Sequence, residues 1–222
     1  MSKLKVDTIL KKAGTGTITI GQSGDTISIP SGATLANSGT ATGFDGGLVF
    51  INEVSSSSEV SNLTLDNVFT SSYTNYMIVG EYTLINGTAP QPRFQFRTGG
   101  ASGSDLTANE YNYHFIRQNA DSDSLNNHRA TGAASCEFGP GTSNDSARVG
   151  IRITWTVYDP VSSTQRTSIS GHGKVTATDG NSCFIAGSCD YKATTSVTGI
   201  KFYAHSDNVK NGHFRVYGIV DS

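Results

Sequence analysis

Charged residues are scarce in this chain of 222 residues. Asp, Glu, Lys and Arg together make up 15% of it, and the formal net charge is −2. Binding to nucleic acids depends chiefly on cationic side chains that neutralise phosphates. We therefore expect no nucleic-acid partner.

Long apolar runs are also missing. The first seven residues, Met1 to Asp7, contain no apolar stretch of the length that a signal peptide needs, and no later run approaches the roughly 20 apolar residues of a membrane span. We expect no membrane insertion and a protein that begins in the cytoplasm of the cell that makes it.

Cysteine is limited to Cys136, Cys183 and Cys189. Three cysteines cannot all pair within one chain, and none of them forms a Cys-x-x-Cys ligand pair. We interpret them as reduced core or strand residues, with a Cys183–Cys189 bridge as the alternative.

The motifs of common enzymes are absent as well. The sequence has no Gly-x-Ser-x-Gly elbow and no glycine-rich phosphate loop ahead of a helix. Its histidines lack the close spacings of a structural zinc site. A glycosidase needs two carboxylates at a defined separation, and pairs such as Asp121 and Asp123 are near each other only in sequence. We expect no catalytic residue, no metal site and no cofactor.

Small polar residues are abundant instead. The chain has 28 Ser, 26 Thr, 15 Asn and 25 Gly, about 42% of all residues, which argues against a helical protein. From Leu48 onward, alternating strands separated by polar turns predict an antiparallel β-sandwich or jelly roll in an all-β protein. The candidate strands are Leu48–Val54, Leu63–Phe69, Tyr76–Ile85, Arg93–Thr98, Tyr111–Gln118, Arg148–Tyr158, Thr167–Val175, Cys183–Tyr191, Val197–His205 and His213–Val220.

Two of these strands show which side chains face inward. Ile151, Ile153, Trp155 and Val157 alternate with polar residues, so they should share one face. In the segment from Tyr111 to Phe115, Asn112 and His114 should face away from the three aromatic residues. Those rings could belong to the core or could stack on sugars.

The first 46 residues differ from the rest of the chain in their sequence pattern. Short Thr/Ile strands separated by Gly turns supply only one or two apolar side chains each, too few to bury a face alone. We predict that residues 1–46 form an oligomerising β neck and that residues 47–222 form the larger domain, although a flexible linker is the alternative for the neck. The predicted oligomer core consists of Ile18, Ile20, Ile27, Ile29 and Leu35.

This first segment resembles a known family. The residues Ser2 to Ile9 (SKLKVDTI), Gly24 to Leu35 (GDTISIPSGATL) and Ser38 to Phe44 (SGTATGF) are similar to the start of tail-fibre-like virion proteins of marine bacteriophages. The resemblance implies a homotrimeric fibre in the virion. Its N-terminal part would join other virion proteins, and its C-terminal domain would face the host surface. The chain is shorter than long tail fibres and has no extended coiled coil or repeated shaft.

Long polar loops on a rigid sheet are the usual place for recognition. The segment Asn119–Ala134 is predicted as such a loop, and a dense set of polar groups in it is our candidate receptor site. These residues are Asp121, Asp123, Asn126, Asn127, His128 and Arg129. The alternative is a mobile loop that binds nothing.

The sequence therefore predicts a non-enzymatic phage fibre protein that binds a host glycan or protein. A decoration fibre of the capsid or tail without a specific receptor is the first alternative. An enzyme that cuts capsule or lipopolysaccharide is the second.

Overall fold

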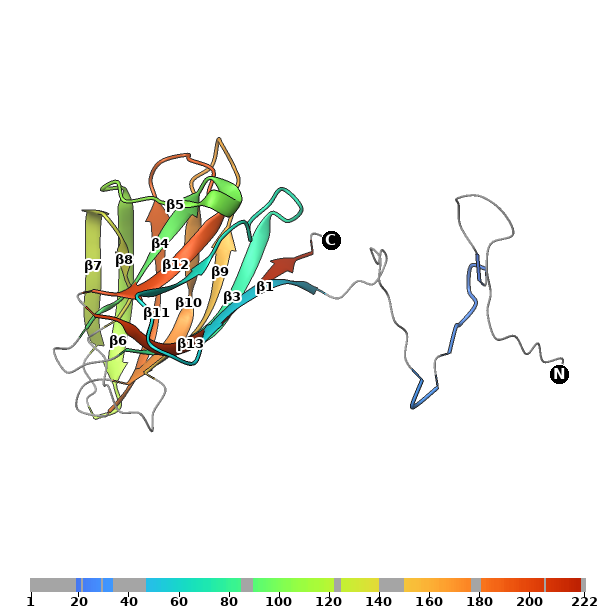
Figure 1. Cartoon of the computed structure of the whole chain (residues 1–222), viewed down its shortest axis with the longest axis horizontal. Helices are drawn as coiled ribbons and strands as arrows, with labels where there is room; N and C mark the ends of the chain where they lie inside the picture. The colour runs from blue at the N-terminus through green and yellow to red at the C-terminus, as the bar shows by residue number, and fades with distance from the viewer. Residues whose placement is uncertain are drawn as a thin grey trace. The chain divides into compact units, whose positions relative to one another are not determined.

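The computed structural model describes residues 19–20, 22–28, 30–33, 47–84, 90–121, 125–139, 150–176, 181–205 and 207–220 (Figure 1). The chain divides into two units, Met1–Phe44 and Asp45–Ser222. The regular elements of the second unit are β1 (Leu48–Ser56), β2 (Asn62–Leu65), β3 (Asn75–Leu84), β4 (Pro92–Thr98), the 3-10 helix η1 (Gly100–Ser102), β5 (Ser104–Asp105), β6 (Tyr111–Asn119), β7 (Leu125–Ala133), β8 (Cys136–Glu137), β9 (Ile151–Tyr158), β10 (Ser168–Thr176), β11 (Ser182–Tyr191), β12 (Gly199–Ala204) and β13 (Val209–Ile219). Within these described ranges, no helix has the length and hydropathy that crossing a bilayer requires.

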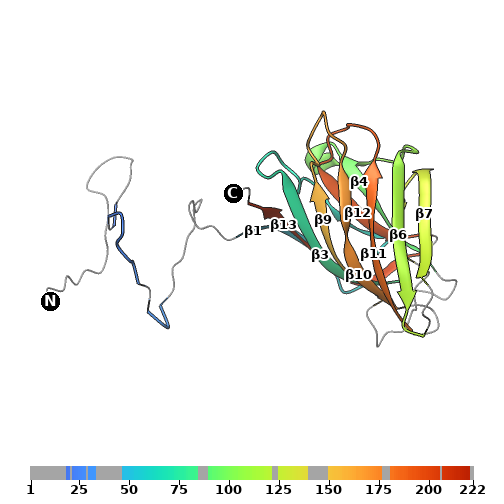
Figure 2. The same cartoon turned by 180° about the vertical axis from the view of Figure 1, so that it is seen from behind.

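The strands form two antiparallel sheets, which confirms the predicted all-β class. The large sheet has eight strands in the order β1-β13-β3-β9-β10-β11-β6-β7, and the small sheet has the order β2-β12-β4-β5, with β8 also paired to β4. Figure 2 shows β9, β10, β11, β6 and β7 running side by side. The two sheets enclose one hydrophobic core as a sandwich.

Aromatic residues from both sheets fill this core. Trp155 of β9 packs edge-on against Phe138 at a ring separation of 4.6 Å and against Phe94 of β4 at 5.5 Å. Phe202 of β12 stacks in parallel on Phe214 of β13 at 3.9 Å. The contacts of Trp155 with Phe94 and of Phe202 with Phe214 connect the sheets, because each joins a residue of the large sheet to one of the small sheet.

The alternation predicted for two strands is confirmed. All four apolar residues of β9, from Ile151 to Val157, are buried. On β6, Tyr111 and Phe115 are core residues, while Asn112 and His114 face outward. The core interpretation of these two rings is therefore correct.

The three cysteines form no disulfide and are buried, as expected for reduced core residues. Cys183 and Cys189 both point inward from β11, and the strand rises about 3.3 Å for each of the six steps along the chain from one to the other. This separation is far beyond the reach of a disulfide. The alternative of a Cys183–Cys189 bridge is wrong.

The described residues of the first unit include two turns. Gly24 and Gly32 have φ angles of 91° and 85°, which only glycine adopts readily, and each lies in a turn closed by a backbone hydrogen bond. Thr26–Ser28 are outside any strand in this single chain, and Ile20 and Ile27 are each 60% exposed. Of the predicted oligomer core, Ile18, Ile29 and Leu35 lie outside the described residues.

One predicted loop is a strand. Most of the segment Asn119–Ala134 forms β7, which pairs with β6 at the edge of the large sheet. Polar residues line both faces of β7, so the period-two pattern of a half-buried strand is missing. The loop prediction was wrong because an edge strand needs few apolar residues.

Candidate functional site

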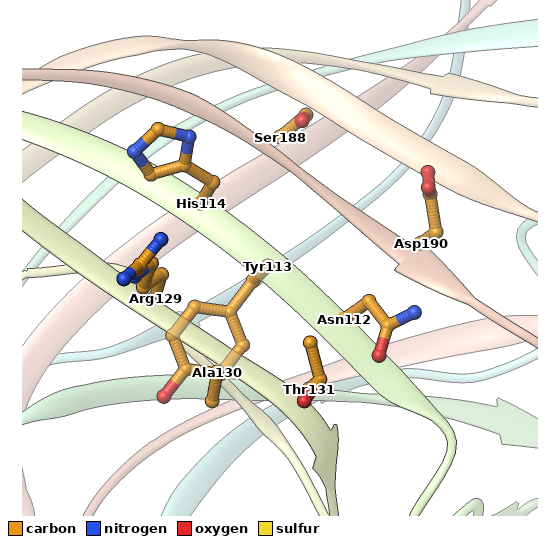
Figure 3. A pocket seen from close by; sticks show the side chains of 8 residues that line it. All are labelled: Asn112, Tyr113, His114, Arg129, Ala130, Thr131, Ser188 and Asp190. Atoms are coloured by element: carbon orange, nitrogen blue, oxygen red, sulfur yellow. The ribbon is translucent and has the colours of Figure 1, made fainter.

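A polar hollow lies on the outer face of the large sheet, over β6, β7 and β11 (Figure 3). It is open to solvent and has a volume of about 590 Å³. Its lining residues are Asn112, Tyr113, His114, Arg129, Ala130, Thr131, Ser188 and Asp190.

The register of three strands brings the polar side chains of this hollow together. Asp190 of β11 lies opposite Asn112 of β6, and Ser188 lies opposite His114. On the other side of β6, His114 lies opposite Arg129 of β7. Because side chains of directly paired residues lie on the same face of a sheet, these five form one surface.

Hydrogen bonds fix two of the side chains. The backbone N–H of Gly132 donates to Asn112 Oδ1 over 3.0 Å, and Gly132 has a φ of 66° at the irregular end of β7. His114 Nε2 lies 3.1 Å from Asn127 Oδ1, also across the β6–β7 pair. The amide and the imidazole are thus oriented before any ligand arrives, which reduces the entropy lost on binding.

The two charged residues of the polar hollow are Arg129 and Asp190. Arg129 and Asp190 are both exposed, and within the described residues neither forms an ion pair. A guanidinium donates up to five hydrogen bonds, and a carboxylate only accepts. The hollow therefore offers strong donors and strong acceptors to one ligand.

The hollow contains a serine, a histidine and an aspartate, the residue types of a hydrolase triad. In a triad, the histidine bonds the serine on one side and the carboxylate on the other. Here His114 Nε2 interacts with Asn127, and Figure 3 shows Asp190 on the other side of the hollow from His114. Ser188, His114 and Asp190 are thus not arranged for nucleophilic catalysis.

The six predicted receptor residues do not form one cluster. Asn127 and Arg129 project from the outer face of β7, because their partners on β6 are the outward residues Ile116 and His114. Asn126 and His128 alternate with them and point toward the other face. Asn126, Asn127 and His128 together line a smaller cavity of about 230 Å³ at the edge of the sheet. Asp121 is exposed and accepts a hydrogen bond from Asn181 Nδ2 over 2.9 Å. Asp123 lies outside the described residues.

His128 belongs to an internal network at the edge of the sandwich. Its Nε2 lies 2.8 Å from Glu137 Oε1, and Arg93 Nη2 lies 2.7 Å from Glu137 Oε2. Burial alone would raise the pKa of Glu137, but His128 and Arg93 lower it below its ordinary value. Burial and the nearby Glu137 carboxylate raise the pKa of Tyr113 to about 12, and the Tyr113 ring stacks on His128. The packing indicates that His128 supports the fold.

Ser188 and Asp190 were not among the predicted site residues. In the strand Cys183–Tyr191 they alternate with the buried Cys189 and Tyr191, so their outward direction was readable from the sequence. Their position beside Asn112 and His114 was not readable, because β11 and β6 are separated by more than 60 residues of chain.

In the described part of the chain, no group of three His, Cys, Asp or Glu side chains could hold a metal ion. Comparisons with models of protein families, with curated proteins and with solved structures gave no match for this chain.

Proposed function

We propose that this chain is a non-enzymatic virion fibre protein of a bacteriophage, and that its β-sandwich binds a glycan on the host surface. The single observation that carries the binding part of the proposal is the polar hollow. It presents amide, imidazole, guanidinium, hydroxyl and carboxylate groups on a rigid sheet. Sugar hydroxyls both donate and accept hydrogen bonds, so a mixed set of this kind suits them.

A shallow, open site binds one sugar weakly, because little surface is removed from water. Several copies of the site on one particle compensate for this, since binding of the first copy raises the effective concentration of the others. A homotrimer provides three copies. The resemblance of the first segment to tail-fibre-like proteins supports the trimer and the attachment of that segment to other virion proteins.

The exposed isoleucines of the first unit also support assembly. Ile20 and Ile27 leave 60% of their surface in water in the single chain. Contact with other copies would bury that apolar surface, which stabilises the assembly by roughly 25 cal/mol for each Å².

The acidic groups support binding without hydrolysis. The general acid of a glycosidase has a raised pKa, and it works with a second carboxylate. The polar hollow contains one carboxylate, that of Asp190. Among the described residues the two carboxyl groups with shifted pKa values, Glu53 and Glu137, are both shifted downward.

The test is adsorption of the purified full chain to candidate host cells and to an array of bacterial glycans. The double variant Asn112→Ala/Asp190→Ala should lose binding, because it removes an oriented amide and the only carboxylate in the lining of the hollow. Thr156→Ala is the matched control, because Thr156 faces outward in the middle of the same sheet and does not line the hollow. Equal binding by the double variant and the wild type would contradict a site in the polar hollow.

The assembly is tested separately by light scattering. Ile27→Asp would place negative charges close together in an apolar contact, so the mass in solution should fall from that of a trimer to that of a single chain. An unchanged mass would rule out Ile27 as part of the oligomer core. A trimer that adsorbs to no host would favour a decoration fibre.

A further inference from the structure

A second hollow lies on the outer face of the large sheet, where β10, β11 and β6 run side by side. It has a volume of about 460 Å³, and Phe184, Lys174 and Gln118 are among its lining residues. We call it the aromatic hollow. Phe184 lies opposite Lys174 on one side and opposite Gln118 on the other.

Phe184 exposes 51% of its surface at this site. The ring of His172, from β10, is nearly parallel to that of Phe184, with a centroid separation of 6.5 Å. Lys174 and Gln118 place hydrogen-bond donors beside the rings. An exposed ring flanked by donors fits the apolar C–H face of a sugar together with its hydroxyls.

The two hollows lie along one strand. The outward residues of β11 are, in order, Ser182, Phe184, Ala186, Ser188 and Asp190. Phe184 belongs to the aromatic hollow, while Ser188 and Asp190 belong to the polar hollow. Ala186 carries only a methyl group, so no bulky side chain of β11 separates the two sites. At about 3.3 Å per residue, Phe184 and Asp190 are roughly 20 Å apart along the strand.

We propose that the two hollows are the ends of one elongated site, and that its ligand is a linear polysaccharide lying along β11. This inference rests on the proposed function and specifies its ligand class as a chain of sugars rather than a single terminal sugar. One part of the chain stacks on Phe184 and His172. Another part forms hydrogen bonds with Asn112, Arg129 and Asp190.

The experiment is isothermal titration calorimetry of the full chain with linear oligosaccharides of increasing length. They are prepared from the surface polysaccharide of a strain to which the wild type adsorbs. Soluble oligosaccharides report the affinity of one site without avidity. The wild-type affinity should rise with oligosaccharide length until the ligand spans both hollows.

Phe184→Ala tests the aromatic end. It should weaken binding of the longest oligosaccharide about tenfold and leave the shortest one unchanged, because only the long ligand reaches the ring. Phe50→Ala is the matched control, because Phe50 is 52% exposed on the same face of the sheet but lies on β1 at its far edge. Since both rings are exposed, neither change should alter the unfolding midpoint by much.

Two results would overturn the elongated site while keeping the proposed function. One is an affinity that does not depend on oligosaccharide length. The other is a Phe184→Ala variant that binds the longest oligosaccharide as tightly as the wild type does. If the wild type adsorbs to cells but binds no oligosaccharide from their polysaccharide, glycan recognition fails, and the elongated site fails with it.

Discussion

The outer face of the small sheet and the polar hollow of the large sheet treat their charged side chains in opposite ways. On the small sheet, Arg97 of β4 lies between two carboxylates, with its Nε 2.6 Å from Asp66 Oδ1 and its Nη1 in contact with Asp105. Lys201 of β12 also contacts Asp105. These four side chains satisfy one another, and Asp66, the stronger hydrogen-bond partner, helps to raise the pKa of Arg97.

On the large sheet, the polar hollow contains Arg129 and Asp190, which form no ion pair within the described residues. The difference separates two uses of charge in one fold. Charges that are paired and half-buried stabilise the small sheet, whereas unpaired, exposed charges are available to a ligand. Substitutions on the two faces should therefore affect different measurements.

The largest effect is expected for Arg97→Met. It leaves Asp66 and Asp105 without their shared partner, and the Arg97 side chain is only 13% exposed. We expect the free energy of unfolding, measured in urea, to fall by about 2–3 kcal/mol. The affinity for oligosaccharides should stay unchanged. Arg166→Met is the control, because Arg166 is exposed in the connection between β9 and β10. An Arg97→Met variant that lost binding but kept the stability of the wild type would contradict the assignment of these charges to stability.

The next effect concerns pH and Glu137, whose side chain is 7% exposed. The folded protein lowers the pKa of Glu137 below its ordinary value of 4.5. The ionised carboxylate therefore stabilises the folded state fully above pH 4.5, and this stabilisation is lost as the pH falls through the folded pKa. Glu137→Gln should be about 1–2 kcal/mol less stable than the wild type at neutral pH. The difference should shrink in acid. Urea titrations at several pH values measure it, and a constant difference would exclude ionisation as the cause.

Arg129→Ala should have a smaller effect on stability and a specific effect on binding. Because Arg129 is exposed on an edge strand, we expect the free energy of unfolding to change by less than about 0.5 kcal/mol. Affinity for the host oligosaccharide should fall about tenfold, since a charged hydrogen bond is lost. Arg129→Lys keeps the charge but not the planar fork, so it should restore binding only in part. Isothermal titration calorimetry with the same oligosaccharide measures the affinities of the wild type, Arg129→Ala and Arg129→Lys.

The smallest effect is expected for Glu81→Gln. Arg152 Nε lies 2.9 Å from Glu81 Oε2 on the large sheet, and both side chains are well exposed. Solvent screens such pairs, so the loss of stability should be under about 0.5 kcal/mol, with binding unchanged. A loss as large as that of Arg97→Met would show that pairing, and not burial, decides the role of charge in this fold.

Much of the fold was predictable from local pattern. The alternation in β9 predicted which residues enter the core, and that in β6 separated Asn112 and His114 from the buried rings. Strand ends were less predictable. The strand expected to reach Phe69 ends at Leu65, shortly before Asn67 adopts a left-handed φ of 53°.

The candidate site was predictable only in part. Arg129 was expected, but in a loop, because β7 is an edge strand with few apolar residues on either face. His128 was predicted as a ligand-binding residue, and only the tertiary structure shows that it packs against Tyr113 and Glu137. Composition identifies polar residues, yet it cannot tell which of them satisfy one another inside the protein.

The sequence by itself determined the all-β class and the inward or outward direction of side chains in the strongly alternating strands. These features follow from steric preferences and the period of two, which act over a few residues. Tertiary structure alone decided that Asp190 lies beside Asn112 and that Phe184 lies between Lys174 and Gln118. Such neighbours arise when distant strands pair to bury a common core, and that pairing depends on the whole chain.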